Sequence, residues 1–277
     1  MLILPLHKPF TLATLPLVTL LLVVANALVY FGWQLGDARR LEAAQAWYLQ
    51  SGLGGYEVPA YEKYLRQAAR RDALAAFEAL PEARRAGFVG MSTLSDVAFV
   101  TAMEEGRLLE SAQRHAAWQA LRRPYQARLD EVFTLRHVMR SSEWSPARML
   151  SSAFLHGGFM HLLGNMLFLV VLGLLLEGAL GGWRFLGVYL LGAFGASLAS
   201  LWWRWGESGS GLGASGAVAA LMGAFCVVWG RRPVRFFYWF AVVFDYVRAP
   251  AIWLLPLWLG WEVYNLLANT DAGIGFD

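Results

Sequence analysis

The stretch Gly211-Leu212-Gly213-Ala214-Ser215-Gly216-Ala217 opens an apolar segment that runs to Trp229. Small residues recur every four positions in two rows within this segment: Ser215, Ala219 and Gly223, then Gly216, Ala220 and Ala224. Such rows let helix backbones approach closely in lipid, so we predict a central helix of a membrane bundle. Ser215 would lie at the N-terminal end of this helix, where unpaired N–H groups and a partial positive charge suit an oxyanion. Packing is the alternative role for this serine.

The composition places the chain among polytopic membrane proteins. Hydrophobic residues make up 57% of the 277 residues, and the formal net charge is only +3, which gives a nucleic-acid-binding function little support. The single cysteine, Cys226, lies within an apolar segment, so neither an intramolecular disulfide nor a cysteine metal cluster is expected. The first apolar segment is longer than a signal peptide, and we interpret it as a retained helix.

Further apolar segments have the length of membrane spans. A helix of ~17–20 residues with almost no charge is long enough to cross a bilayer. We expect five spans, at residues 10–33, 159–176, 185–203, 214–229 and 249–267. The aromatic run at 236–246 is short for a span and is interpreted as interfacial or re-entrant. The predicted fold class is therefore all-α, a bundle of membrane helices.

Residues 34–150 differ in kind, because they hold most of the charged residues and are nevertheless close to neutral. Runs rich in Ala, Leu, Arg and Glu predict amphipathic helices at about 38–50, 59–79 and 94–137. Neither a metal-ligand spacing nor a glycine-rich phosphate loop occurs in this region. We expect a soluble helical insertion, and we assign it no function.

Two polar residues stand out at the start of the span at 159–176. His161 and Asn165 are four positions apart and therefore lie on one helix face. Polar groups buried in a bilayer are costly unless they are paired, and they often mark function, although an interhelical hydrogen bond is the alternative for either residue alone. The arginine cluster at 231–235 is expected to be cytoplasmic. Counting back along the spans places Ser215, His161 and Asn165 together toward the outer face, with the N-terminus in the cytoplasm and the insertion outside.

With these residues placed, the chain resembles the rhomboid family of intramembrane serine proteases. Gly213-Ala214-Ser215-Gly216 matches the G-x-S-G nucleophile motif of that family, and His161 with Asn165 matches its H-x-x-x-N motif. The resemblance extends to three further positions: His156, Arg148 and Glu177. It covers about 15–33 and 144–267, and it does not include 34–140. Ala217 stands where the G-x-S-x-G elbow of soluble hydrolases needs a glycine, so that motif is not present.

The resemblance implies a serine endopeptidase that cleaves transmembrane segments of other membrane proteins by a Ser–His dyad. Ser215 would be the nucleophile, and the oxyanion-hole set would be His161, Asn165 and Gly213, helped by the backbone N–H of Ser215. His156, Arg148 and Glu177 would support this site. The expected partners are transmembrane protein substrates and the lipid bilayer, without a cofactor, a metal or nucleic acid. The expected location is a multi-pass position in a membrane, a bacterial inner membrane with a cytoplasmic N-terminus.

The sequence departs from the family pattern at the base, which the family carries on a sixth span. No histidine follows His161 in the printed sequence. Three explanations stay open: the chain is part of a longer protein, which we favour; it is an inactive rhomboid-like protein that binds membrane clients; or His156 or His161 serves as the base. The expected parts are thus the tail and first span at 1–33, the insertion and entry loop at 34–150, and a rhomboid-like core without its final helix at 151–277.

Overall fold

The structure is a computed structural model that describes residues 2–5, 15–206, 209–240, 243–253, 255–256 and 259–260. Its contacts divide the chain into two compact units. The core unit comprises Met1–Tyr30, Ser152–Leu198 and Leu212–Asp277, and the insertion unit comprises Phe31–Ser151 and Ala199–Gly211. The insertion unit thus includes a short segment from the second half of the chain. The domain boundaries expected from the sequence remain a prediction.

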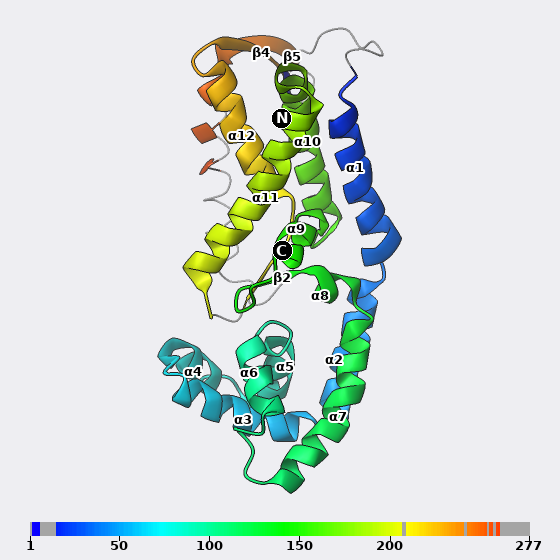
Figure 1. The fold of residues 1–277 in the computed structure, drawn as a ribbon, viewed down its shortest axis with the longest axis vertical. Helices are drawn as coiled ribbons and strands as arrows, with labels where there is room; N and C mark the ends of the chain where they lie inside the picture. Colours follow the sequence, from blue (N-terminus) through cyan, green and yellow to red (C-terminus); the bar gives the residue numbers. More distant parts are fainter. Residues whose placement is uncertain are drawn as a thin grey trace. The chain divides into compact units, whose positions relative to one another are not determined.

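The core unit is a bundle of long helices, coloured from blue through green to orange in Figure 1. They are α1 (Leu17–Val29), α10 (Phe159–Leu180), α11 (Gly182–Arg204) and α12 (Ser215–Trp229). A continuous buried cluster joins them; among its members are Leu22, Leu169, Leu172, Phe185, Tyr189, Leu221 and Phe225. Burial of this surface is what orders the helices relative to one another within the unit. The predicted fold class, a helical membrane bundle, is confirmed.

Within the part of the chain that the structure describes, three helical segments are long and apolar enough to cross a membrane: Leu17–Gln50, Phe159–Leu180 and Gly182–Arg204. The bent pair Glu82–Ser92 and Val97–Glu104 would make a fourth if it counts as one span. The helix α12 is apolar but shorter, at 15 residues. The predicted span at 249–267 is wrong at its first residues, which end strand β5 and form the 3-10 helix Ala251–Trp253, and residues 261–267 lie outside the described part of the chain.

One of the two predicted rows of small residues, the row with Gly216 and Ala220, packs against α11. A Cβ atom added at Gly192 in α11 would overlap the methyl group of Ala220 in α12, and one added at Gly216 would overlap that of Ala196. The two helices therefore meet through glycine on one side and alanine on the other at two successive levels. Gly223 differs, because nothing lies within 4 Å of the position that its Cβ would take. Close approach through small residues packs α12 against α11.

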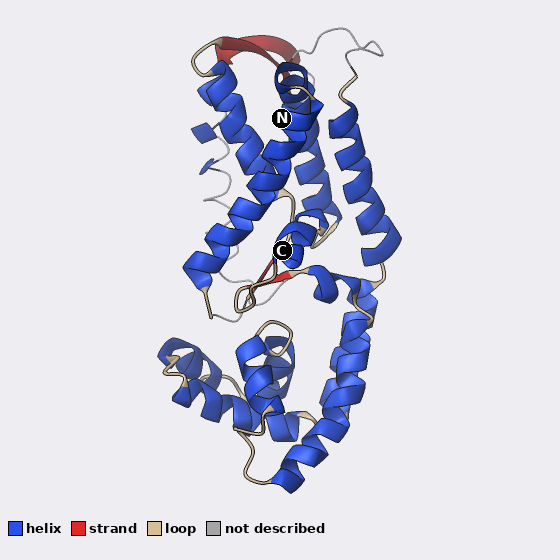
Figure 2. Ribbon diagram, viewed as in Figure 1, coloured by secondary structure: helices blue, strands red, loops and turns tan. Residues whose placement is uncertain are grey.

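Strands add two small sheets to this helical fold (Figure 2). The strands β1 (Leu2–Pro5), β4 (Pro233–Phe240) and β5 (Val243–Pro250) form an antiparallel sheet in the order β1-β4-β5. The segment at 236–246, interpreted above as interfacial or re-entrant, is thus largely a β-hairpin, which its aromatic and β-branched residues favour. The strands β2 (Met139–Arg140) and β3 (Ser210–Gly211) pair within the insertion unit.

The insertion unit is helical, as expected, but its helices are shorter and more numerous than predicted. They are α2 (Asp37–Gln50), α3 (Gly54–Gln67), α4 (Arg71–Glu78), α5 (Glu82–Ser92), α6 (Val97–Glu104), α7 (Ala112–Asp130), α8 (Phe133–His137) and α9 (Pro146–Ser151). The helix predicted at 59–79 breaks after Gln67, where Ala69 adopts a positive φ of 53°. The helix predicted at 94–137 breaks at Gly106, whose φ is 70°. Short irregular elements complete the chain: the π-helix Tyr30–Gln34 and the 3-10 helix Ser152–Phe154.

The insertion unit has its own buried core. Tyr61 lies edge-on to Phe77 and Phe99, at ring-centroid distances of 5.8 and 4.9 Å. Beside these rings the buried carboxylate of Glu57 accepts hydrogen bonds from Trp118 at 2.9 Å and Arg122 at 3.3 Å. A buried charge is tolerated only when it is paired in this way. The insertion is therefore a folded helical unit in its own right.

Candidate active site

Ser215 is the first residue of α12 and follows the buried Ala214. The first backbone hydrogen bond of the helix runs from the N–H of Val218 to the carbonyl of Ala214 at 2.9 Å. The N–H groups of Ser215, Gly216 and Ala217 precede that bond, so helix geometry gives them no acceptor within the helix. Ser215 itself is exposed. A hydroxyl and a set of backbone donors thus occupy the N-terminal end of this helix.

Gly213 brings the predicted residues together. Its φ of 116° lies in the region that favours glycine, and its N–H donates to the carbonyl of Ser152 at 2.9 Å. A Cβ atom at this position would lie 2.8 Å from Nε2 of His161 and 3.8 Å from Oγ of Ser215. The imidazole and the hydroxyl therefore both lie within 4 Å of one point beside Gly213, and a side chain at this residue would clash with the imidazole. Because its N–H is already bonded, Gly213 contributes space here and no oxyanion donor.

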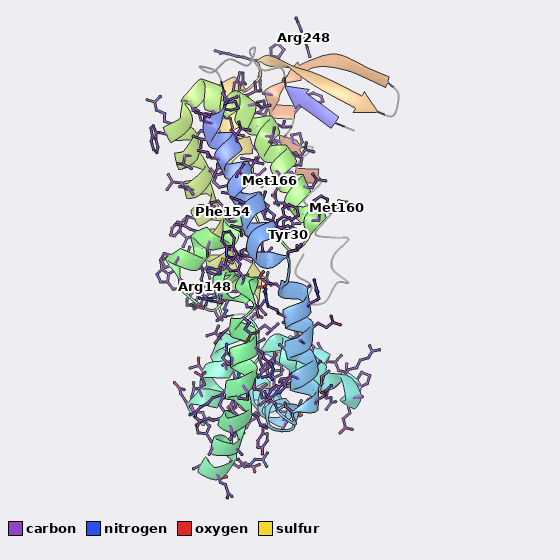
Figure 3. All side chains as sticks on the ribbon, turned by 90° about the vertical axis from the view of Figure 1, so that its right-hand side faces the viewer. Tyr30, Arg148, Phe154, Met160, Met166 and Arg248 are labelled. Carbon is purple, nitrogen blue, oxygen red and sulfur yellow. The ribbon has the colours of Figure 1, made fainter. Side chains whose placement is uncertain are left out.

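His161 lies in the first turn of α10. Figure 3 labels its neighbour Met160 and also Met166, which lies further along the same helix. Nδ1 of His161 faces the N–H of Gly157 at 3.5 Å, the upper limit of a hydrogen bond. An accepting Nδ1 leaves the proton of a neutral imidazole on Nε2. Nε2 is the atom next to Gly213. In this tautomer, the N–H donor of His161 lies next to Gly213, on the side of Ser215.

Asn165 follows one turn later on the same face of α10 and is 7% exposed. Its side-chain Nδ2 donates to the carbonyl of His161 at 3.0 Å. An amide nitrogen carries two N–H donors, so the bond to His161 uses one of them. This bond fixes the orientation of the side chain on the helix.

His156 lies in the loop before α10 and is 3% exposed. Its ring is 5.4 Å from that of His161 and nearly perpendicular to it. Burial, followed by the nearby His161, lowers the pKa of His156 to about 4, against a smaller opposing effect of a backbone hydrogen bond at Phe154. The ring is therefore neutral at pH 7 and packs against the ring of His161 as an uncharged group.

Glu177, near the end of α10, is bonded to the start of α1. Its carboxylate accepts from the N–H of Val18 at 2.9 Å and from both the N–H and the hydroxyl of Thr19 at 2.8 Å. The N-cap position of α1 is Pro16, which makes no side-chain capping bond. Glu177 supplies that cap from another helix, where the helix dipole also favours a negative charge. Its role is to join two helices of the bundle.

Arg148 belongs to α9 in the insertion unit (Figure 3). Its Nη1 donates to the carbonyls of Leu135 at 3.2 Å and Val138 at 3.3 Å, and its Nε lies 3.5 Å from a carboxylate oxygen of Glu143. The described contacts of Arg148 thus hold the loop that precedes α9. The structure brings Ser215, His161, Asn165 and Gly213 together within the core unit, and Arg148 is not among the described residues around them.

Three contributors to this site were not anticipated from the sequence: Ser152, Gly157 and Thr19. Ser152 and Gly157 act through backbone atoms, which any residue carries, so no side-chain pattern marks them. Thr19 is one polar residue at the start of an apolar segment, and only the fold pairs it with Glu177. Among the described residues, no group of three or more His, Cys, Asp or Glu side chains is placed to hold a metal ion.

The comparison with known families agrees with the motifs at this site. Residues 143–272 match the rhomboid domain. The chain is a member of the rhomboid family. The matched residues include Ser215, His161 and Asn165 together with the supporting residues His156 and Glu177. The resemblance recognised in the sequence is thereby confirmed.

Individual rhomboid relatives match parts of the chain. RHOMBOID-like protein 5 of Arabidopsis thaliana is 41% identical over 90 residues, which are 32% of this chain and 28% of the relative. RHOMBOID-like protein 6, mitochondrial, of the same plant is 28% identical over 145 residues, 50% of this chain and 46% of the relative. Rhomboid protein 1, mitochondrial, of Saccharomyces cerevisiae is 36% identical over 97 residues, 34% of this chain and 28% of the relative. The chain spans less than half the length of each of these rhomboid proteins, and no solved structure matches it.

Proposed function

We propose that this rhomboid protein is an intramembrane serine endopeptidase that cleaves transmembrane segments of other membrane proteins. The observation that supports this most directly is the backbone conformation of Gly213, which lets Nε2 of His161 and Oγ of Ser215 both approach this residue. A substrate carbonyl bound beside these two side chains would meet a nucleophile and a hydrogen-bond donor at once.

In the proposed reaction, Oγ of Ser215 forms a bond to the carbonyl carbon of the substrate, and the serine proton passes to a base. The carbonyl oxygen becomes an oxyanion that receives hydrogen bonds from Nε2–H of His161, the second N–H of Asn165 and the N–H of Ser215. Collapse of this intermediate breaks the C–N bond as the base gives its proton to the leaving amine, and it leaves an acyl group on Ser215, which water then hydrolyses.

A second candidate function, binding without cleavage, depends on whether a residue is present to accept the serine proton. No histidine follows His161 in the printed sequence, and the preceding argument uses His161 as a donor. An inactive rhomboid-like protein that binds membrane helices without cleaving them would need no base. This second function predicts that client proteins bind equally well to the wild type and to Ser215→Ala, with unchanged client length.

The location we propose is an integral position in a membrane, with the N-terminus and the arginine cluster at 231–235 in the cytoplasm and the start of α12 toward the outer face. The support is the positive-inside rule together with the apolar helices of the core unit. The relatives named above come from a plant and a yeast, and two carry the word mitochondrial in their names. A bacterial inner membrane remains a prediction from the sequence.

The test is co-expression of the protein, as encoded by its whole gene, with a reporter whose transmembrane segment contains helix-destabilising residues. We expect a shortened reporter with the wild type and the intact reporter with Ser215→Ala. The matched control is Ser210→Ala, an exposed serine in β3 that should leave cleavage unchanged. Cleavage that persists in Ser215→Ala would refute the proposal, and equal client binding without any cleavage would favour the alternative.

A further inference from the structure

The insertion unit contains a cavity that the proposed protease reaction does not use. Its volume is about 280 Å³, and every residue that lines it belongs to the insertion unit. The wall comes from the α5–α6 junction, from α6, from α7 and from the segment between 135 and 148. A single water molecule occupies roughly 30 Å³ of liquid volume, so the cavity is large enough for a small organic molecule.

Cations outnumber carboxylates in the lining of this cavity. Four arginines face it: Arg122, Arg136, Arg140 and Arg148. The two acidic residues of the lining are Glu104 and Asp130, and Asp130 already accepts a hydrogen bond from Gln126 at 2.8 Å. The guanidinium group is planar and carries five donors in a geometry that matches a phosphate or carboxylate. The excess of arginine therefore points to an anionic ligand.

Two of the arginines have a donor that remains unused. Nε of Arg122 and Nε of Arg140 are buried and make no hydrogen bond among the described residues. The side chain of Arg122 is 7% exposed, and its other nitrogens bond to Glu57 at 3.3 Å and to Gln126 at 3.2 Å. An unsatisfied buried N–H costs free energy, so such groups commonly bind a ligand or a water molecule. The unused donors belong to two different walls of the cavity, α7 and β2.

With Glu57 and Glu143 behind the lining, carboxylates equal the arginines in number, but they are distributed unevenly among them. Glu143 lies 3.6 Å from Arg140 and 3.5 Å from Arg148, so one carboxylate serves two guanidinium groups at long distances. Both arginines also donate to the same carbonyl, that of Leu135, at 3.2 Å. Burial, followed by the charge of Arg148, lowers the pKa of Arg140 against the opposing effect of Glu143. A second anion beside these two arginines would relieve their repulsion.

Part of the cavity wall is apolar, beside the polar residues Thr93, Thr101 and Gln126. Leu94 and Val97 line it near the start of α6, Val100 lines it one turn later, and Leu129 lines it from α7. A site for a free inorganic anion has no need of such a wall. A ligand with an anionic group at one end and hydrocarbon at the other would use both parts of the surface.

The insertion unit also carries the aromatic residues that are typical of a membrane interface. Trp202, Trp203 and Trp205 are 82%, 80% and 60% exposed at the end of α11 and just after it. Tryptophan is enriched at the level of the lipid headgroups. Five residues after Trp205 begins β3, which pairs with β2, and β2 contains the cavity residue Arg140. The cavity wall is thus joined by strand pairing to a segment with headgroup-level chemistry.

We propose that this arginine-lined cavity binds an organic phosphate, whose phosphate group contacts Arg122, Arg136 and Arg140 and whose apolar part packs on Leu94, Val97 and Leu129. The shared chemistry is a phosphate ester with a hydrocarbon portion. It has two sources, the headgroup of an anionic phospholipid or a soluble phosphate ester. The Trp202–Trp205 segment favours the lipid source. This function of the insertion is independent of whether Ser215 cleaves substrates.

The experiment uses the whole 277-residue chain in phosphatidylcholine nanodiscs that contain a small fraction of phosphatidylglycerol. Native mass spectrometry measures how much phosphatidylglycerol stays bound, with and without added glycerol 3-phosphate. The test variants are Arg136→Gln, which changes an exposed lining residue, and Arg140→Gln. The matched control is Arg123→Gln, which removes the same charge from an exposed position of α7 outside the cavity. Far-ultraviolet circular dichroism checks folding, and Arg136→Gln decides the result if Arg140→Gln fails to fold.

We expect each test variant to weaken phosphatidylglycerol binding about tenfold, as for the loss of one charge-assisted hydrogen bond, while Arg123→Gln changes it less than about twofold. Displacement by glycerol 3-phosphate supports the proposal with a soluble ester as ligand, and resistance to it supports the proposal with a lipid as ligand. Two results overturn the proposal: neither probe binds above the level of phosphatidylcholine, or Arg123→Gln weakens binding as much as Arg136→Gln.

Discussion

The bond between Glu177 and the start of α1 makes a quantitative prediction about stability. The carboxylate accepts three hydrogen bonds, two from the backbone N–H groups of Val18 and Thr19 and one from the Thr19 hydroxyl. Glu177 and Thr19 are 9% and 1% exposed, so water does not replace a bond that is lost. In Glu177→Gln, one oxygen becomes an NH₂ group that faces a donor. Since a hydrogen bond to a charged group contributes about 1.5–3 kcal/mol, we expect a loss of about 2–3 kcal/mol in the free energy of unfolding.

The assay is reversible unfolding of the purified chain in mixed micelles with increasing dodecyl sulfate, followed by helicity. The matched comparison is Thr19→Val, which removes only the hydroxyl bond and should cost about 1 kcal/mol. The double variant should lose less than the sum of the two single losses, with a coupling of about 0.5–2 kcal/mol, because the two residues share one interaction. A Glu177→Gln variant within about 0.5 kcal/mol of the wild type, or a coupling of zero, would show that this bond does not join α10 to α1.

Three other perturbations have defined outcomes. Gly213→Ala should cost about 1–3 kcal/mol of unfolding free energy, since φ is 116° and the new Cβ lies 2.8 Å from His161, whereas Gly223→Ala, with open space around its Cβ, should be neutral or slightly stabilising in the same dodecyl sulfate titration. Gly216→Leu should prevent the contact of α12 with Ala196, and loss of the cooperative unfolding transition checks this. The pKa of His156 is lowered to about 4 in the folded chain, so the unfolded chain binds the extra proton. The free energy of unfolding should therefore be highest above about pH 6.5, fall by about 3 kcal/mol at most as the pH drops, and level off below about pH 4. His156→Gln should flatten this pH dependence, and a profile that is unchanged in this variant would contradict the assignment.

Much of the core unit follows from local sequence rules. The apolar lengths predict α10 and α11 to within a few residues, and the four-residue spacing of Gly216 and Ala220 predicts which face of α12 meets its neighbour. These features depend only on the spacing and size of residues along the chain, so they can be predicted without knowledge of the tertiary structure. The pairing of Ser215 with His161 was also anticipated, because both residues begin a span on the same predicted side.

Other features depend on contacts that no local pattern encodes. The aromatic run at 236–246 reads as interfacial by hydropathy, yet it is a hairpin paired with residues near the N-terminus. The helices of the insertion were merged in prediction because Ala69 and Gly106 interrupt otherwise helical composition. Gly213 was assigned to the oxyanion hole on its motif position, but whether its N–H is available depends on Ser152, which lies 61 positions earlier in the chain. The arginine-lined cavity needs four residues from separate elements.

The most direct measurement of the central claim is covalent labelling of the protein encoded by the whole gene with a fluorophosphonate, with the adduct located by mass spectrometry. A fluorophosphonate reacts with a serine that has been activated as a nucleophile and forms an oxyanion-like adduct. The account predicts one adduct, on Ser215, whose rate of formation falls by about 10²–10³-fold in His161→Ala because an oxyanion donor is lost. An adduct that is absent from Ser215, or that forms at the same rate without His161, would contradict it.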